Sequence, residues 1–154
     1  MFKTIRILVF LFLTAVQVAA MIPQEYDYSL KPGGSSRKLV VTFRNVAETA
    51  IVDLPQRGRL YKIGKNLYTC EPYTIKGDQQ SYWDIRALNL IERKFNPVTF
   101  QQGNNITNLG VSNNRLYILI LDSTIMKVLG DKVVPIEDPS EKAIAFWLFH
   151  RSHL

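Results

Sequence analysis

The feature that most constrains the fold is a series of closely spaced apolar runs in residues 114–150. The runs are residues 116–121, residues 125–128 with 132–136, and residues 143–149. Short apolar runs bounded by Asp, Ser, Gly and Pro are typical of strands joined by tight turns. This part of the sequence therefore predicts an antiparallel meander.

Two of these runs, residues 117–121 and 144–149, are continuously apolar rather than alternating. A strand with one face in water alternates apolar and polar residues, whereas a continuous run indicates a strand that is covered on both faces. We therefore expect another element to pack over the sheet, and an upstream helix is the expected cover.

The last run, residues 143–149, has a second interpretation. Asp138, Pro139 and Glu141 fit a helix start, with an N-cap, a proline at the first position and an acid in the first turn. A short segment that is apolar on all sides fits a buried strand better than a helix. The length criterion favours the strand, and the helix stays open as the alternative.

The clearest helical pattern covers residues 78–95. Its apolar positions, spaced three to four residues apart, are Ile85, Leu88, Ile91 and Phe95. Ser81 and Asp84 have the spacing of a capping box, and Pro97 stops the pattern. The sequence therefore predicts an α+β fold in which one amphipathic helix packs on a curved antiparallel β-sheet.

Residues 1–20 have the pattern of a secretory signal peptide. Lys3 and Arg6 form the basic region, residues 7–16 the apolar core, and residues 18–20 the small-residue cleavage site. The apolar core is too short to span a membrane, so we expect a soluble, exported product. Loss of the two basic residues with the leader lowers the formal net charge from +6 to +4. That charge permits acidic partners but lacks the concentrated field of a dedicated nucleic-acid-binding protein.

Residues 21–37 are expected to form a flexible N-terminal arm, because they are polar and contain a Pro-Gly-Gly-Ser-Ser run. The remaining residues, 38–154, amount to a single domain. Strands are expected at residues 38–43, 60–63 and 67–70, the last two as a hairpin. Residues 45–54 carry both helical spacing and β-branched residues, which leaves helix and strand open.

Cys70 is the only cysteine, so no internal disulfide can form. Small secreted domains usually depend on disulfides. Three explanations stay open: the packing suffices, Cys70 pairs with another chain, or the protein works in a reducing compartment inside another cell.

The sequence lacks the local motifs of nucleotide, zinc, hydrolase and metalloprotease sites, and we predict no cofactor and no metal. His150 and His153 would face opposite sides of a strand and would not share an ion. Alternating aromatic and basic residues form a possible binding surface for single-stranded nucleic acid, with a half-buried edge hairpin as the alternative. The residues of this surface are Tyr61, Lys62, Lys65, Tyr68, Tyr73 and Lys76.

The order of several motifs over residues 67–150 resembles the small guanyl-specific ribonucleases of filamentous fungi. It resembles even more closely their non-catalytic relatives, the ribonuclease-like candidate effectors of powdery mildews. The motifs are Tyr68-Thr69-Cys70, the helical pattern, Asn96-Pro97, Leu116-Tyr117 with Ile120-Leu121, Asp131-Lys132-Val133-Val134, and a strand ending at His150. The resemblance implies a single ribonuclease-like domain in residues 38–154.

Ribonucleolysis in that family needs a carboxylate base, a histidine acid and cations around the phosphate. The strand that begins at Tyr117 has no acid where the resemblance places the base. Lys132 replaces an arginine and lacks its bidentate fork, and Val98 replaces a histidine, whereas His150 falls at the position of the acid. The resemblance therefore implies a pseudoenzyme with no catalytic residue and with Tyr117, Lys132 and His150 as vestigial active-site positions.

The function implied by the resemblance is that of a secreted virulence effector. Such a protein would act in the host cytoplasm by binding a host plant protein or host RNA without cleaving it, and an immune receptor would recognise it as an avirulence factor. One alternative is an active secreted guanyl-specific ribonuclease that uses His150 and a relocated carboxylate such as Glu137. Another is an extracellular all-β binding module, such as part of a propeller, because residues 105–127 read like one repeat.

Overall fold

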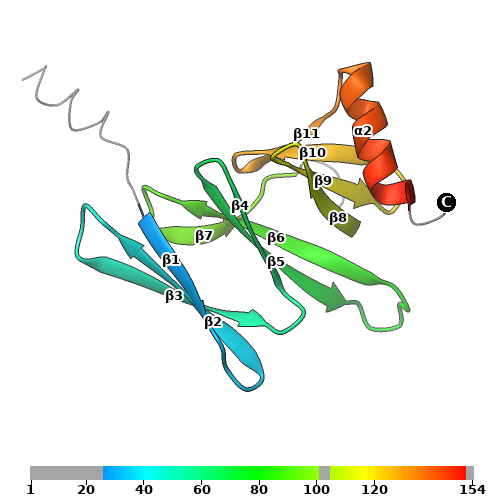
Figure 1. Cartoon of the computed structure of the whole chain (residues 1–154). Helices are drawn as coiled ribbons and strands as arrows, with labels where there is room; N and C mark the ends of the chain where they lie inside the picture. The colour runs from blue at the N-terminus through cyan, green and yellow to red at the C-terminus, as the bar shows by residue number, and fades with distance from the viewer. Residues whose placement is uncertain (1–25, 101–104, 152–154) are drawn as a thin grey trace, which may run out of the picture.

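The computed structural model describes residues 26–100 and 105–151. In this part of the chain, strands form three antiparallel sheets and a helix follows them (Figure 1). The first sheet contains β1 (Tyr26–Lys31), β2 (Ser36–Phe43) and β3 (Glu48–Pro55). The second contains β4 (Arg59–Ile63), β5 (Asn66–Thr74), β6 (Ser81–Asn89) and β7 (Lys94–Pro97). The third contains β8 (Ile106–Ser112), β9 (Arg115–Ile120), β10 (Ile125–Leu129) and β11 (Lys132–Pro135), and the helix is α2 (Pro139–His150).

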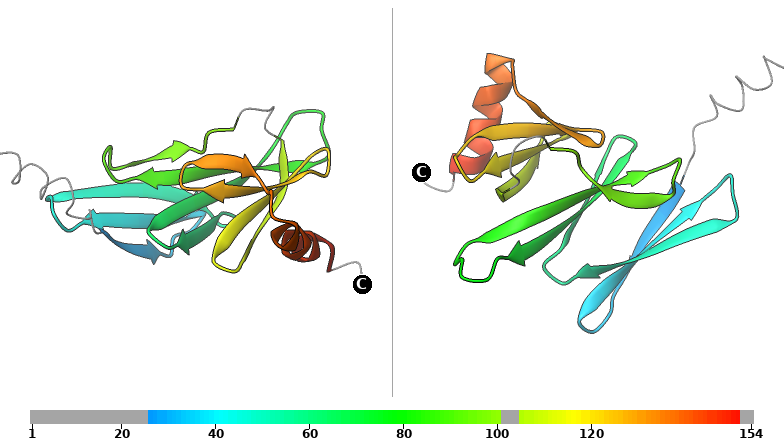
Figure 2. Two further views of the ribbon diagram at one scale, coloured as in Figure 1. Left: turned by 90° about the horizontal axis from the view of Figure 1, so that it is seen from above. Right: turned by 180° about the vertical axis from the view of Figure 1, so that it is seen from behind.

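Each sheet is a meander, and the sheets follow one another in chain order as layers, with α2 at the end opposite the first sheet (Figures 1 and 2). A buried apolar cluster joins each pair of neighbouring layers. Between the first and second sheets the cluster contains Leu39, Val41, Phe43, Leu67, Leu88 and Phe95. Between the second and third sheets it includes Tyr68, Cys70, Ile85, Ala87, Leu116 and Ile118. Between the third sheet and α2 it contains Tyr117, Ile136, Ala145 and Phe149.

Strand β9 is covered on both faces. Leu116 and Ile118 belong to the cluster shared with the second sheet, whereas Tyr117 and Leu119 pack in the cluster shared with α2. The two-sided cover expected from the continuous apolar run is therefore confirmed. The covering elements differ from the expected one, because they are the second sheet and the C-terminal helix rather than an upstream helix.

Residues 78–95 are not a helix, and the predicted α+β fold with one helix packed on a curved sheet is wrong. They form β6, a turn and the start of β7, and the chain between Tyr26 and Arg151 is mostly β wherever the structure describes it. Ile85 and Ala87 pack toward the third sheet while Leu88 packs toward the first, an alternation that the three-to-four spacing concealed. Pairing of β6 with both β5 and β7 outweighs the local helical pattern.

The turn after β6 shows why the helix does not continue. The side chain of Asn89 accepts hydrogen bonds from the backbone N–H groups of Ile91 and Glu92, both at 2.9 Å. Arg93 then takes a left-handed conformation, with φ of 57°. An asparagine side chain that bonds nearby backbone groups favours a turn over a helix, so this residue redirects the chain into β7.

The strand expected at residues 143–149 is also wrong, and the alternative helix start is correct. Asp138 is the N-cap, its side chain accepts from the N–H of Ser140 at 2.9 Å, and Pro139 is the first helical residue. The helix is 12 residues long because it includes the polar turn before the apolar run. The length criterion counted only the apolar residues and therefore favoured a strand.

Of the predicted meander, the part in residues 116–136 is confirmed as β9, β10 and β11, whereas its last run is α2. The strand at residues 38–43 and the hairpin of β4 and β5 are confirmed. The ambiguous residues 45–54 fall mainly in strand β3. From Tyr26 on, the segment expected as a flexible arm contains strand β1 and the start of β2. The predicted signal peptide lies outside the described residues.

The second and third sheets each have a Leu-Tyr pair near the start of their second strand, which is β5 in the second sheet and β9 in the third. In β5, Leu67 packs toward the first sheet and Tyr68 toward the third. In β9, Leu116 packs toward the second sheet and Tyr117 toward α2. Each tyrosine hydroxyl donates a hydrogen bond to the following layer, from Tyr68 to the Gly130 carbonyl at 2.7 Å and from Tyr117 to a Glu141 carboxylate oxygen at 2.9 Å. The helix α2 therefore covers the outer face of the third sheet in the same way that the third sheet covers the outer face of the second.

Cys70 lies on the face of β5 that packs against the third sheet and is fully buried. Burial is the main cause that raises the pKa of its thiol to about 12. In the folded chain, Cys70 acts as a core residue and offers no thiol for pairing with another chain.

We expect the Cys70 thiol to react with an aromatic disulfide reagent only after denaturation, because the native thiol is both inaccessible and protonated. The measurement is the rate of thiolate release in native buffer and in urea. A Lys76→Cys variant, at an exposed position, is the matched control and should show one fast-reacting thiol. Fast modification of the native unmodified chain would contradict the buried position.

Gly110 in β8 packs closely against Leu148 of α2. A Cβ atom at this position would lie 3.1 Å from Cδ2 of Leu148. We expect Gly110→Ala to lower the free energy of unfolding by about 1–3 kcal/mol, measured by urea unfolding, because the Leu148 side chain must move from its packed position. The double variant with Leu148→Ala should lose less unfolding free energy than the two single variants lose together. If the two losses were strictly additive, the residues would not be in contact.

Candidate functional site

The three vestigial active-site positions lie in different environments. Tyr117 is buried in β9, and its hydroxyl bonds Glu141. Lys132 is exposed at the start of β11, where it pairs with Leu129 in the strand ladder. His150 is near the end of α2, with its ring stacked on Phe146. The contacts recorded among the described residues do not bring these three side chains together.

The six residues of the predicted aromatic and basic surface do not form one surface either. Tyr61 packs against the cluster between the second and third sheets, whereas the Lys62 ammonium lies over the rings of Tyr26 and Tyr28 in the first sheet, at 5.6 and 5.8 Å. Tyr68 is a core residue, and Tyr73 is partly exposed. Lys65 and Lys76 are exposed in turns.

The feature that sequence reasoning missed is the outer face of α2. Ile144, Phe146 and Trp147, here called the helix patch, are exposed, the two aromatic side chains to 53% and 56%. Ala145 and Phe149, on the opposite side of the same helix, are buried against the third sheet. A helix that is apolar all round is normally buried all round, so the helix patch is an apolar surface without a cover among the described residues.

The helix patch is braced from within α2. The rings of Phe146 and His150 are stacked with centroids 4.0 Å apart and planes 12° apart. Nδ1 of His150 lies 2.9 Å from the Phe146 carbonyl oxygen and donates to it. These contacts restrict the rotamer of Phe146, so less entropy is lost when a partner covers the ring.

A hollow of about 440 Å³ opens beside the helix patch. Its lining is apolar at Ile125, Ile136, Ala143 and Phe146 and polar at Ser123 and Lys142. The Lys142 ammonium has no hydrogen-bond or ion-pair partner in the part of the chain that the structure describes, and the residue is exposed. The hollow therefore combines an apolar lining with one positive charge that has no partner among the described residues.

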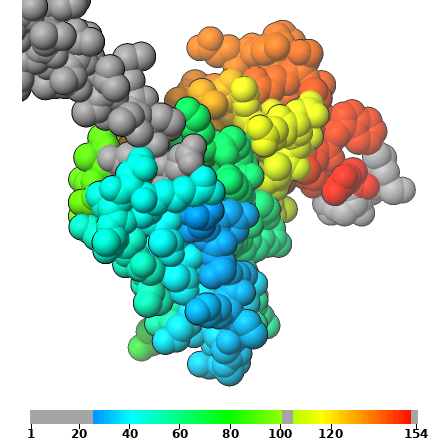
Figure 3. Space-filling model, turned by 60° about the vertical axis from the view of Figure 1, so that its left-hand side comes forward, coloured from blue at the N-terminus to red at the C-terminus, as the bar shows by residue number. Residues whose placement is uncertain are grey.

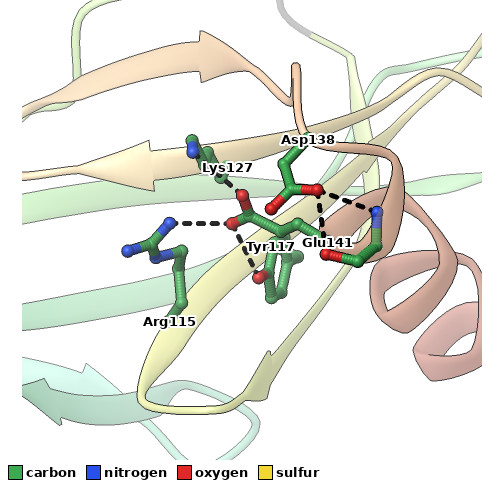
Figure 4. A network of polar contacts seen from close by, with 6 residues as sticks. Arg115, Tyr117, Lys127, Asp138 and Glu141 are labelled. Carbon is green, nitrogen blue, oxygen red and sulfur yellow. Dashed lines mark hydrogen bonds and ion pairs between the residues drawn. The ribbon is translucent and has the colours of Figure 1, made fainter.

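A polar clamp holds α2 in place (Figure 4). One carboxylate oxygen of Glu141 accepts from Arg115 Nη1 at 2.8 Å and from the Tyr117 hydroxyl at 2.9 Å. The other accepts from Lys127 Nζ at 3.1 Å. Arg115 and Tyr117 come from β9 and Lys127 from β10, so a single carboxylate joins the helix to two strands.

The pKa values follow from this geometry. Burial alone would raise the pKa of Glu141, but the hydrogen bonds from Lys127, Tyr117 and Arg115 outweigh it and hold the pKa below its usual value. Burial and then the bond to Glu141 raise the pKa of Tyr117 to about 12. Glu141 is therefore ionised and Tyr117 is a neutral donor at neutral pH, which suits a permanent clamp better than an acid–base pair.

Within residues 26–100 and 105–151, no cluster of three or more histidine, cysteine or acidic side chains could hold a metal ion. In the same residues, no helix is both long and apolar enough to cross a lipid bilayer. The helix patch could have been found from the sequence by treating residues 143–149 as part of a helix that starts at Asp138. The outer positions of this run are as apolar as its inner ones.

We expect Glu141→Gln to lower the free energy of unfolding at neutral pH by about 1–2 kcal/mol, because Lys127 and Arg115 lose their counter-ion. The matched control is Glu137→Gln, an exposed acid outside the clamp. Urea unfolding at several pH values measures both variants against the parent chain. Equal stability of the two variants at neutral pH would contradict the clamp.

The same comparison tests the pH dependence. The folded-state pKa of Glu141 lies below its unfolded value near 4.5, so its stabilisation is complete above that value. It is lost as the pH falls through the lower folded-state pKa. The stability difference between the parent chain and Glu141→Gln should therefore shrink only in that acidic window.

In comparisons with known proteins, no family model, no curated protein and no solved structure matches this chain. Its function is therefore inferred from its own residues and their geometry.

Proposed function

We propose that this chain is a non-catalytic, exported binding protein that docks a partner protein on the helix patch of α2. One observation carries the proposal: Phe146 and Trp147 are both more than half exposed on a capped and clamped helix. Figure 3 shows the red helix at the rim of the molecule, apart from the blue strands of the first sheet. Export follows from the leader pattern of residues 1–20, which lies outside the described residues.

The energetics favour a protein partner for this surface. Aromatic side chains dominate the binding energy of protein interfaces because each buries a large area at little cost in conformational entropy. Covering the exposed parts of Phe146 and Trp147 is worth roughly a few kcal/mol at about 25 cal/mol per Å². The apolar hollow beside Phe146 adds a recess for one further apolar side chain.

The charge at the hollow defines the partner more closely. Lys142 lines the recess and has no partner among the described residues, so its ammonium is available for a carboxylate. The complementary segment therefore presents one apolar side chain to the hollow and one acidic side chain next to it. This chemistry supports a protein as the partner, which is one of the two kinds of partner expected from the sequence. The other, RNA, is tested by the experiment below.

The ribonuclease-like site is not part of the proposal. It depended on a helix-on-sheet fold that the chain does not have. The relocated-carboxylate alternative needs Glu137 and His150 to face a shared ribose phosphate. His150 instead stacks on Phe146 and bonds its carbonyl oxygen, and Glu137 is exposed before the helix.

The partner is found with a photo-crosslinking amino acid placed at Trp147 in the full exported chain. The control carries the same group at Ile91, which is the most exposed large apolar residue of the described chain, at 82%, and lies in the turn after β6. We expect a crosslink to a defined peptide from position 147 and none from position 91. Equal crosslinking from both positions would mean non-specific adhesion.

Binding to that partner is then measured with purified proteins. We expect Phe146→Ser combined with Trp147→Ser to weaken binding at least about 100-fold, since two central aromatic anchors are lost. Ile91→Ser is the control and should leave binding unchanged. Lys142→Glu should weaken binding, and changing the acidic residue of the partner that contacts Lys142 to lysine should restore it. Crosslinks confined to RNA or to a second copy of this chain would overturn the proposal.

A further inference from the structure

A second hollow, of about 500 Å³, lies between the first and second sheets, and we call it the inter-sheet hollow. Strands of both sheets line it. The residues that carry the argument are Val52 of β3, Thr69 and Glu71 of β5, Arg86 of β6, Arg93 of the turn after β6, and Phe95 of β7. The helix patch lies on α2, which packs on the third sheet, so the two regions are separate.

The polar residues of the second sheet point toward the first sheet. Leu67 and Leu88 pack in the cluster between these two sheets. Side chains alternate along a strand, so Thr69 and Glu71 share the face of Leu67, and Arg86 shares the face of Leu88. Thr69 and Arg86 are also direct cross-strand neighbours. These three polar side chains therefore line the same side of the inter-sheet hollow.

An apolar end of the hollow follows on the same face. Phe95 pairs with Leu88 across β6 and β7 and belongs to the same cluster, and Val52 of β3 packs against that cluster. Arg93 bounds this end, because its Nε lies 2.8 Å from a carboxylate oxygen of Glu48 in β3. Along the second sheet, the acid position, the row of Thr69 and Arg86, and the apolar row therefore follow in this order.

Thr69 marks the hollow as a site. It is the polar residue among the fully buried residues that the structure describes, with 2% of its surface exposed. Its hydroxyl makes no hydrogen bond with any residue in 26–100 or 105–151. A buried hydroxyl without a partner lowers stability, and Thr69 lines the hollow. A bound ligand would supply the missing partner.

The charges around the hollow are not all balanced. Arg86 Nε binds Asp84 at 3.0 Å and Arg93 binds Glu48, so each guanidinium has a carboxylate partner. The Glu71 carboxylate has no partner among the described residues. A guanidinium carries five N–H donors, so Arg86 keeps donors for a ligand beyond its bond to Asp84. The hollow therefore offers an unpaired carboxylate for a cation beside hydrogen-bond donors for an anion.

A ligand with a single charge meets only part of this arrangement. An anion alone would be repelled by Glu71, and a cation alone would leave the donors of Thr69 and Arg86 unused. An α-amino acid carries an ammonium and a carboxylate on the same carbon, and an apolar side chain on that carbon matches Val52 and Phe95. The volume of the hollow is also within the range of small-molecule sites, roughly 300–1,000 Å³.

We propose that the inter-sheet hollow binds a free α-amino acid with an apolar side chain. Glu71 accepts hydrogen bonds from the ammonium of the ligand. Arg86 and the Thr69 hydroxyl donate to its carboxylate, and its side chain packs on Phe95 and Val52. The proposal does not depend on the helix patch, so either site can exist without the other.

The test is isothermal titration calorimetry of the purified full chain with L-leucine, L-valine, L-methionine and L-phenylalanine. We expect saturable binding of one ligand per chain for at least one of the four. Two analogues of that amino acid are then titrated, the amine without the carboxylate and the acid without the ammonium. For leucine these are 3-methylbutylamine and 4-methylpentanoate. Each analogue should bind at least about 10-fold more weakly, because a charge-assisted contact is lost.

Variants of the lining residues identify the contacts. Glu71→Gln should weaken binding of the amino acid about 10–100-fold but leave the weaker binding of the ammonium-free acid unchanged. Thr69→Val keeps the size of the side chain and should weaken binding of the amino acid without lowering the thermal midpoint. Glu137→Gln is the control with the same chemical change at an exposed position before α2.

Three results would overturn the proposal. The first is no saturable heat with any of the four amino acids. The second is equal weakening of the amino acid and of its ammonium-free analogue in Glu71→Gln, which would show that Glu71 does not contact the ammonium. The third is an amine that binds as tightly as its parent amino acid, which would assign the hollow to a purely cationic ligand.

Discussion

The architecture depends on one constraint, which is that strand β9 is apolar on both faces. A strand of this kind cannot stand at a surface, because water would contact either its leucine and isoleucine face or its tyrosine face. The second sheet covers the first of these faces through Leu116 and Ile118. The remaining face must be covered by whatever follows the third sheet in the chain, and α2 meets that need with Ala145 and Phe149.

The cover is fixed by charge as well as by packing. Apolar contacts alone are not directional, so they do not set the rotation of a helix that is apolar all round. Glu141 sets it, because its carboxylate must meet Arg115, Tyr117 and Lys127 on two strands. The same rotation places Phe146 and Trp147 on the outside. The apolar outer face of α2 is therefore a fixed property of the folded chain and not the result of a loosely attached helix.

The sequence predicted those parts of the fold in which local pattern and tertiary pairing agree. The meander of β9, β10 and β11 has clear turns at Ser123 and Gly130, both with positive φ, and its strands were found at nearly the expected residues. The same agreement holds for β2 and for the hairpin of β4 and β5. The need for cover on both faces of β9 also followed directly from its continuous apolar run.

The two wrong secondary-structure predictions, the helix over residues 78–95 and the strand over residues 143–149, have a common physical cause. In β6, Ile85 and Leu88 are three residues apart and both buried, which imitates a helix face although they pack into different layers. In α2, the apolar residues on the exposed side imitate a buried strand. Both errors come from the assumption that an apolar residue faces a single core. A chain built as successive layers has several cores, and a binding face adds apolar residues that face none.

The candidate site was less predictable than the fold. Among the six residues selected from their aromatic and basic alternation, Tyr61 and Lys62 point to opposite faces of the second sheet, because neighbouring residues in a strand point apart. Tyr68 belongs to the core for the same reason. Lys65 and Lys76 lie in turns. Finding the helix patch needed both the helix start at Asp138 and the knowledge of which side the third sheet covers, and only the second of these requires coordinates.

The matching Leu-Tyr pairs of β5 and β9 have a consequence for how cooperatively the chain holds together. Each pair links one layer to the layer before it and the layer after it, so every buried cluster is shared by adjacent layers only. Energetically, such a chain resembles a short row of coupled units more than a sphere with a single centre. Fraying at the α2 end would uncover the tyrosine side of β9 while the contacts between the first two sheets persist, so damage at one terminus stays local.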